Sequence, residues 1–145
     1  MSLTNLLVPT YKQMLQALSG WLDKAQAHVP EDGQAALLDE GRNAGERPGS
    51  LADAQGRIAE TIALLDGLAP GALDGDPERP IAHSLPMGMI FDLTAGQYAR
   101  DWALPQFYFH LMTAYAILRA QGIALGKADF VTHMFAYVRP GTLPA

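Results

Sequence analysis

The stretch that decides the fold of this chain is Leu104-Pro105-Gln106-Phe107-Tyr108-Phe109-His110-Leu111-Met112-Thr113-Ala114-Tyr115-Ala116-Ile117-Leu118-Arg119. It carries no charge before Arg119 and is apolar on nearly every side of a helix, so we expect the central helix of a bundle rather than a surface helix. One polar stripe interrupts it, because Gln106, His110 and Thr113 are spaced i, i+4 and i+7 and therefore share one helix face. This stripe, together with the neighbouring Tyr108 and Tyr115, is the candidate binding site.

Length, charge and cysteine content limit the class of protein. A chain of 145 residues can bury the core of one domain, so we expect a single domain over residues 1–145, in which residues 131–145 form a C-terminal arm. The net charge of −5 provides no basic field, which excludes nucleic acids and anionic membrane surfaces as partners. The sequence has no cysteine, so any metal would be bound by His, Asp, Glu or Gln.

Two features favour a soluble cytoplasmic protein. Residues 1–7 lack the basic region and the small-residue cleavage site of a signal peptide. The longest uncharged run, residues 102–118, is shorter than the ~20 residues that a membrane-spanning helix needs. We therefore expect no membrane segment.

The first half of the chain predicts one long helix and one short one. Apolar residues recur at three- and four-residue intervals over residues 9–27, with Pro9 suited to the first turn. Six glycines and prolines then punctuate residues 30–50, which leaves room only for a short helix over residues 34–40 and a loop after it. The second helix is therefore expected to be shortened.

The middle of the chain predicts a capped helix and a hairpin. Ser50 and Asp53 form a capping signature for a helix that ends near Gly67. Residues 69–80, rich in proline, glycine and acids, are expected to be a surface connection. Two short apolar segments, residues 81–85 and 89–93, flank a turn and predict a β-hairpin, which must lie on another element to be stable.

The last helices carry their own end signals. Thr94 and Gln97 form a second capping box, which opens a short helix. Pro105 is expected to break or restart this helix, and Gly122 is a plausible residue for the end of the central helix.

The polar stripe leaves two interpretations open. A histidine four residues from another ligand often places two corners of a metal site on one helix, but here the partner of His110 is Gln106, an amide and a weak ligand for zinc or nickel. In the first interpretation Gln106, His110 and Thr113 form a buried polar network. In the second, His110 is a metal ligand, and one or more of the other histidines complete the site: His28, His83 or His133.

The hairpin, the capped turn and the stretch 104–119 resemble a bacterial domain-of-unknown-function branch of the DinB/YfiT-like superfamily of metalloenzymes. The segments that also carry the likeness are Val8-Pro9-Thr10, Leu22-Asp23-Lys24-Ala25, Gly122, Gly126-Lys127 and Asp129-Phe130. This resemblance implies an all-α, up-down four-helix bundle that is often dimeric. In some relatives three histidines bind a divalent metal, two of them spaced H-x-x-x-H on the last helix, and the enzymes are thiol-dependent transferases or isomerases.

Carried over by position, His110 matches the second histidine of that pair, and Gln106 stands where the first would be. Residues 30–50 contain no histidine and are too short for the full second helix of the family. We therefore expect a shortened bundle without a working metal site or cofactor, which binds a small molecule or a partner. The alternative is a zinc- or nickel-dependent enzyme with His110 as a ligand. The shortened helix would also leave apolar residues of the last helix uncovered, so we expect a homodimer.

Overall fold

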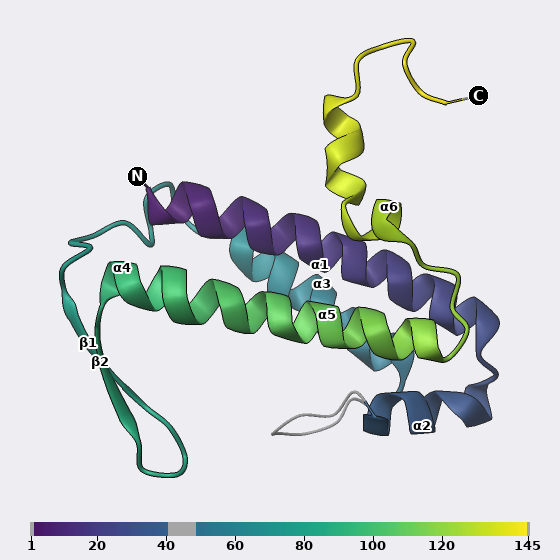
Figure 1. The fold of residues 1–145 in the computed structure, drawn as a ribbon, viewed down its shortest axis with the longest axis horizontal. Coiled ribbons are helices and arrows are strands. Elements are labelled where there is room, and N and C mark those ends of the chain that lie inside the picture. The colour runs from purple at the N-terminus through teal and green to yellow at the C-terminus, as the bar shows by residue number, and fades with distance from the viewer. Residues whose placement is uncertain (1, 41–48, 145) are drawn as a thin grey trace.

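The computed structural model describes residues 2–40 and 49–144, which are mostly helical, with one small antiparallel hairpin (Figure 1). The long helices are α1 (Leu3–His28), α3 (Leu51–Asp66) and α5 (Leu104–Ala120). Figure 1 shows that α1 and α5 run in the same direction and that α3 runs opposite to them. A short helix, α2 (Glu31–Glu40), lies near the far end of α1. The helix predicted over residues 34–40 is therefore confirmed, with a start three residues earlier, whereas its end and the loop expected at residues 41–48 lie outside the described residues.

The remaining elements are small and flank the bundle. They are β1 (Pro80–Ser84), β2 (Ile90–Thr94), α4 (Ala95–Gln97), the π-helical segment η1 (Tyr98–Ala103), α6 (Lys127–Phe130) and the 3₁₀ segment η2 (Thr132–Tyr137). The segment α4–η1–α5 is one continuous helical rod, and η2 leaves the bundle beside α1 (Figure 1). Within the described ranges, no helix is long and apolar enough to cross a membrane.

The helix α1 begins six residues earlier than predicted. The hydroxyl of Ser2 accepts a hydrogen bond from the Asn5 N–H at 3.1 Å, so Ser2 caps the helix. Pro9 therefore lies inside α1, and its placement in the first turn was wrong. A proline inside a helix removes one backbone hydrogen bond. The buried face of α1 compensates for this loss, because Trp21 and Met14 are each only 1% exposed.

The core forms around Trp21. Its ring stacks on Phe130, with 5.6 Å between centroids, and meets the edge of Tyr115 at 5.6 Å. The buried residues of this cluster come from α1, α2, α3, α5 and the segment after α5: Met14, Ala17, Trp21, Ala25, Leu37, Leu51, Leu111, Leu118, Ile123 and Leu125. Burial of these side chains is what orders the three long helices around one another.

The predicted helix caps are confirmed. The Ser50 hydroxyl accepts from the Asp53 N–H at 3.0 Å, and α3 ends at Gly67. In the capping box of α4, the Gln97 N–H donates to Thr94 Oγ1 at 3.2 Å, and the Thr94 N–H donates to the Gln97 side chain at 2.8 Å. At the end of α5, Gly122 has a φ of 83°, a left-handed value that favours glycine.

The hairpin lies on η1, as a stable hairpin requires. Its strands pair antiparallel from Pro80 opposite Thr94 to Ser84 opposite Ile90. The imidazole of His83 contacts the Tyr98 ring at 5.3 Å and the Trp102 ring at 4.9 Å between centroids. The expected hairpin is therefore confirmed, and aromatic contacts hold it against the helical rod.

Two expectations for the last helix need correction. Pro105 lies in the first turn of α5, where regular α-helix restarts as one of the two alternatives predicted, but it does not break the helical rod. The irregularity ahead of it is the wide η1 turn, in which the Leu104 N–H bonds to the Ala99 carbonyl. The helix α5 is also not central. Only Leu111 and Leu118 are buried on it, whereas Phe109 is 63% exposed and Met112 is 47% exposed.

Candidate functional site

The structure places the predicted polar stripe on the outer face of α5. Gln106 and His110 are exposed, and Thr113 donates its hydroxyl hydrogen bond to the Phe109 carbonyl at 2.8 Å. Within the part of the chain that the structure describes, no hydrogen bond joins these three side chains. The interpretation as a buried polar network is therefore wrong, because α5 turns this stripe to the outside.

Tyr108 and Tyr115 share a different face of α5, since they are seven residues apart. Tyr108 is exposed, whereas Tyr115 is half-buried and packs against Trp21. The five candidate binding residues therefore do not converge on one site within a single chain.

The four histidines lie in four separate places. His28 ends α1, His83 lies among the hairpin aromatics, His110 lies on the outside of α5, and His133 lies on η2. Among residues 2–40 and 49–144, no group of three or more histidine, aspartate or glutamate side chains is placed to hold a metal ion. Within one chain, the described residues thus leave His110 without a set of further ligands.

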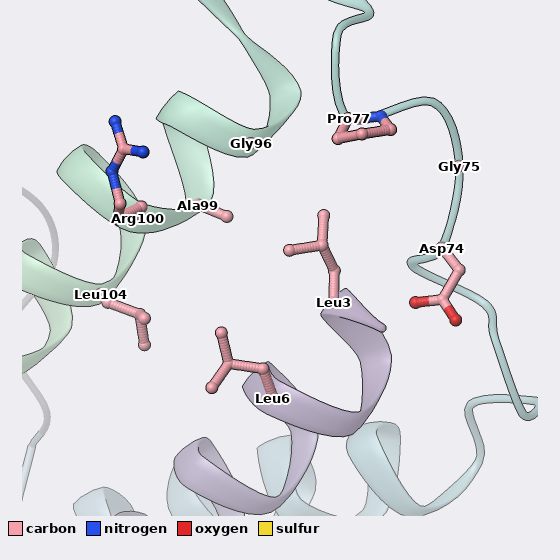
Figure 2. A pocket seen from close by; sticks show the side chains of 9 residues that line it. All are labelled: Leu3, Leu6, Asp74, Gly75, Pro77, Gly96, Ala99, Arg100 and Leu104. Carbon is pink, nitrogen blue, oxygen red and sulfur yellow. The ribbon is translucent and has the colours of Figure 1, made fainter. Parts of the chain in front are cut away.

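The structure forms a cavity at the end of the bundle where α1 begins. Its volume is about 340 Å³, and it opens between the first turns of α1, the loop after α3 and the rod α4–η1–α5 (Figure 2). The lining is mostly apolar and consists of Leu3, Leu6, Asp74, Gly75, Pro77, Gly96, Ala99, Arg100 and Leu104. Figure 2 shows Leu3 and Leu6 pointing into the space between Ala99 and Pro77.

Hydrogen bonds at both ends of the loop hold this cavity open. On one side, Asp74 Oδ1 accepts from the Thr4 N–H at 2.9 Å and from the Thr4 hydroxyl at 3.0 Å. On the other side, the Gly96 N–H donates to the Pro77 carbonyl at 2.9 Å. The loop is thus fastened to the start of α1 and to the start of α4, and the gap between the two attachments is the cavity.

The opposite wall comes from the π-helical turn, because Ala99 and Arg100 both belong to η1. A π turn is wider than an α turn and occurs frequently at functional sites. Ala99 is only 5% exposed, and Figure 2 shows its methyl group pointing into the cavity. The irregular turn therefore shapes the lining directly.

Two charged side chains lie at the rim of the cavity, and they differ in whether an opposite charge neutralises them. The Thr4 backbone N–H and then the Ser2 hydroxyl lower the pKa of Asp74, so this carboxylate is ionised at neutral pH. Arg100 donates from Nε and Nη2 to the Asp101 carboxylate at 2.6 Å each, which raises the pKa of Arg100 and lowers that of Asp101. The positive charge of Arg100 is thus balanced by its neighbour, whereas the donors to Asp74 among residues 2–40 and 49–144 are all uncharged.

A second, more polar hollow of about 310 Å³ lies between α1 and the C-terminal arm. The Lys24 ammonium pairs with Asp129 Oδ1 at 2.6 Å across its edge. His133 Nδ1 lies there buried, without a hydrogen-bond partner among the described residues. A buried water would satisfy this nitrogen, since polar hollows of this size are commonly hydrated.

The sequence did not reveal the cavity, because the residues that line it are far apart in the chain. Its residues come from three segments, 3–6, 74–77 and 96–104, and the middle one was taken only as a surface connection. Asp74 bonds to a residue 70 positions earlier. The only local signal was an acid between Gly71 and Gly75, which also occurs in ordinary turns.

Comparison with known proteins gives two matches. The pattern of a family described as "Domain of unknown function (DUF1993)" matches residues 35–131. A solved structure, described as a DinB family member protein from Shewanella denitrificans, is similar with a TM-score of 0.66 and 23% sequence identity. The likeness covers 98% of this chain and 96% of that chain, and at this identity it concerns the fold alone. No curated protein matches.

Proposed function

The chain belongs to the DUF1993 family and folds like a DinB family member, as its sequence predicted, and from this premise we propose that it is a small-molecule-binding protein without a working metal site. The observation that carries the proposal is the cavity of about 340 Å³ beside Leu3 and Leu6. Pockets that bind small molecules are concave, mainly apolar, and carry a few fixed polar groups at volumes of roughly 300–1,000 Å³. This cavity has each of these properties.

The shortened second helix supports the second half of the proposal. We infer that α2, with ten residues, is what remains of the second helix of a four-helix ancestor. In the metal-binding relatives that the sequence resembles, the second helix supplies one metal-binding histidine. A second histidine of those relatives is replaced here by Gln106. Loss of two of three imidazoles would leave His110 too weak a ligand to hold an ion alone.

Filling the cavity tests the binding function. We expect 1-hexanol to shift the NMR methyl signals of Leu3, Leu6 and Leu104 in the wild-type chain, and we expect Ala99→Leu to abolish these shifts. The matched control is Ala120→Leu, because Ala120 is exposed at the end of α5 and does not line the cavity. Gly75→Leu is a second filling variant, since a Cβ at Gly75 meets no atom within 4 Å. Shifts that persist in both filling variants would contradict the proposal.

The second candidate function is a zinc- or nickel-dependent transferase or isomerase. One observation favours it: the imidazole of His110 is exposed on α5 and has no hydrogen-bond partner among the described residues, so it is free to bind an ion. Metal analysis of protein purified without an affinity tag separates the two functions. Near-stoichiometric metal in the wild type that is lost in His110→Ala would overturn the binding-only proposal.

We also infer that the chain forms a homodimer through α5. The exposed apolar residues of this helix are spaced four, three and four positions apart, which is the spacing of the seam between paired helices: Pro105, Phe109, Met112 and Ala116. No charged residue interrupts this seam, so two copies of it would meet without repulsion. We take this surface to be the uncovered face that the sequence predicts for a shortened bundle.

Sedimentation analysis tests the dimer. We expect Phe109→Glu and Met112→Glu to shift the wild-type dimer to monomer, because each places a charge in the seam. Leu64→Glu is the matched control, since Leu64 is 66% exposed but lies on α3. A wild type that is monomeric at about 100 µM, where even a weak specific dimer forms, would refute the inference.

A further inference from the structure

We propose that the cavity binds an amphipathic cation, namely a primary alkylamine whose chain lies on the leucines and whose ammonium group faces Asp74. This proposal rests on the binding function proposed above and adds the chemical class of the ligand. Two independent features of the cavity carry it: the apolar floor and the sign of the charge at the rim.

The floor fits an aliphatic chain. Leu3 and Leu6 point into the cavity from α1, and Leu104 closes it from the start of α5 (Figure 2). Neither leucine of α1 is fully buried, so both still expose apolar surface to a ligand. Each methylene group that is removed from water on such a surface raises affinity by about fourfold.

The rim offers one acceptor with spare capacity. Asp74 Oδ1 accepts hydrogen bonds from the Thr4 N–H and the Thr4 hydroxyl. The single hydrogen of the Ser2 hydroxyl is shared between the two carboxylate oxygens, with Ser2 Oγ 2.9 Å from Oδ1 and 2.8 Å from Oδ2, and the Leu3 backbone N–H adds a weaker interaction with the carboxylate. Both Thr4 hydrogen bonds fall on Oδ1, so Oδ2 is the more open oxygen of this exposed carboxylate for a further donor. An ammonium group is the donor that best matches its charge.

The opposite rim does not favour an anion. The Arg100 guanidinium is already held by Asp101, and Figure 2 shows its side chain pointing away from Leu3 and Leu6. An adjoining hollow of about 280 Å³ shares Asp74 with the cavity and adds one acid and one base, Asp76 and Arg79. The net charge of the chain is −5, so its overall field attracts cations and repels anions.

Three probes with the same six-carbon chain test the assignment: hexylammonium, 1-hexanol and hexanoate, each titrated into the full-length wild type at neutral pH. We expect hexylammonium to bind tightest and hexanoate weakest. We also expect added salt to weaken the binding of hexylammonium and to leave that of 1-hexanol unchanged, because salt screens the charge on Asp74 but not the apolar contact.

Variants identify the acceptor. We expect Asp74→Asn to weaken hexylammonium by about fivefold, the size of an exposed ion pair, and to leave 1-hexanol binding unchanged. The matched control Asp76→Asn removes a neighbouring carboxylate and should change neither affinity. Because Asp74 also bonds to the start of α1, 1-hexanol binding serves as the internal check that the variant keeps the cavity.

The outcomes separate the two proposals. If 1-hexanol binds and hexylammonium binds no tighter, or if hexanoate binds tightest, the cationic ligand class is wrong while the binding function stands. If none of the three probes binds, the binding function itself fails. Equal binding of hexylammonium at low and high salt would overturn the assignment of Asp74 without use of any variant.

Discussion

At the scale of single residues, Asp74 makes the stability of the protein depend on pH through its hydrogen bonds to the start of α1. Hydrogen bonds from Thr4 and Ser2 hold the pKa of Asp74 below its ordinary value of 3.8. Because these hydrogen bonds favour the ionised form of Asp74 in the folded state, they stabilise the fold. This stabilisation is fully present above the unfolded-state pKa of Asp74. It is lost as the pH falls through the lower folded-state pKa.

We therefore expect Asp74→Asn to be less stable than the wild type at pH 7 and to show a smaller loss of stability between pH 7 and pH 3. Urea unfolding followed by circular dichroism at both pH values measures this difference. Asp76→Asn is the control, since Asp76 accepts from the nearby Glu78 N–H and does not bond to α1. Identical pH dependence in Asp74→Asn and the wild type would contradict the expectation.

His110 and Leu111 are adjacent in sequence and opposite in environment. His110 is exposed, whereas Leu111 is only 3% exposed. We expect His110→Ala to change the free energy of unfolding by less than about 0.5 kcal/mol and Leu111→Ala to lower it by about 2–5 kcal/mol. Denaturant titration of the two variants checks this contrast. A His110→Ala variant as damaged as Leu111→Ala would restore a structural role for the imidazole.

The sequence was a good guide where both partners of an interaction lie within a few residues. Ser50 with Asp53 and Thr94 with Gln97 were identified correctly, since a capping pattern contains its own partner. Asp74 could not be identified, because its partners Ser2 and Thr4 lie about 70 residues earlier in the chain. Long-range hydrogen bonds of this kind leave no periodic signal in the sequence.

At the scale of elements, two glycines show opposite roles. Gly122 ends α5 with a φ of 83°, and a Cβ there would lie 3.5 Å from His28 Nε2. Gly56 lies inside α3, where a Cβ meets no atom within 4 Å. We expect Gly122→Ala to destabilise the protein by about 1 kcal/mol and Gly56→Ala to stabilise it by about 0.5–1 kcal/mol. Thermal unfolding of both variants measures the contrast, and stabilisation by Gly122→Ala would contradict the assigned helix end.

The prolines explain the errors at helix ends. Local rules place Pro9 at a helix start and an interruption at Pro105, because an interior proline loses a hydrogen bond. In the structure, packing of the buried face keeps α1 helical on both sides of Pro9. The irregular hydrogen bonding ahead of Pro105 takes the form of the wide η1 turn, and the rod stays helical. Tertiary packing decides both cases, and a single sequence does not reveal it.

At the scale of the whole molecule, composition alone could not tell a central helix from an uncovered one. The stretch 104–119 is apolar all round, yet a full second helix would be needed to bury both of its sides. The mainly helical architecture, the hairpin and a helix before residue 41 were predictable because each has a local pattern. The exposure of Phe109 and Met112 depends instead on how far the other described elements extend over α5, which no local pattern reveals.

The proposed dimer makes overall stability depend on protein concentration. Association of folded chains stabilises the folded state by mass action, so we expect the wild-type Tm to rise between about 1 µM and about 100 µM protein. Phe109→Glu, which removes the seam, should have the same Tm at both concentrations. Differential scanning calorimetry measures both proteins. A wild-type Tm independent of concentration would count against assembly.

The wide turn η1 also bears on how such chains diverge. Deleting one residue from an ordinary helix rotates the part before the deletion by about 100° relative to the part after it. The buried face of one of the two parts then no longer points at the core. At η1 (Tyr98–Ala103) the same deletion would instead restore regular α-helical winding. The elements on both sides would keep their relative orientation, whereas residues within the turn, such as Ala99, would change the direction in which they face the cavity. A change in segment length at this position, without any substitution, could therefore give a related chain a different hollow on the same scaffold.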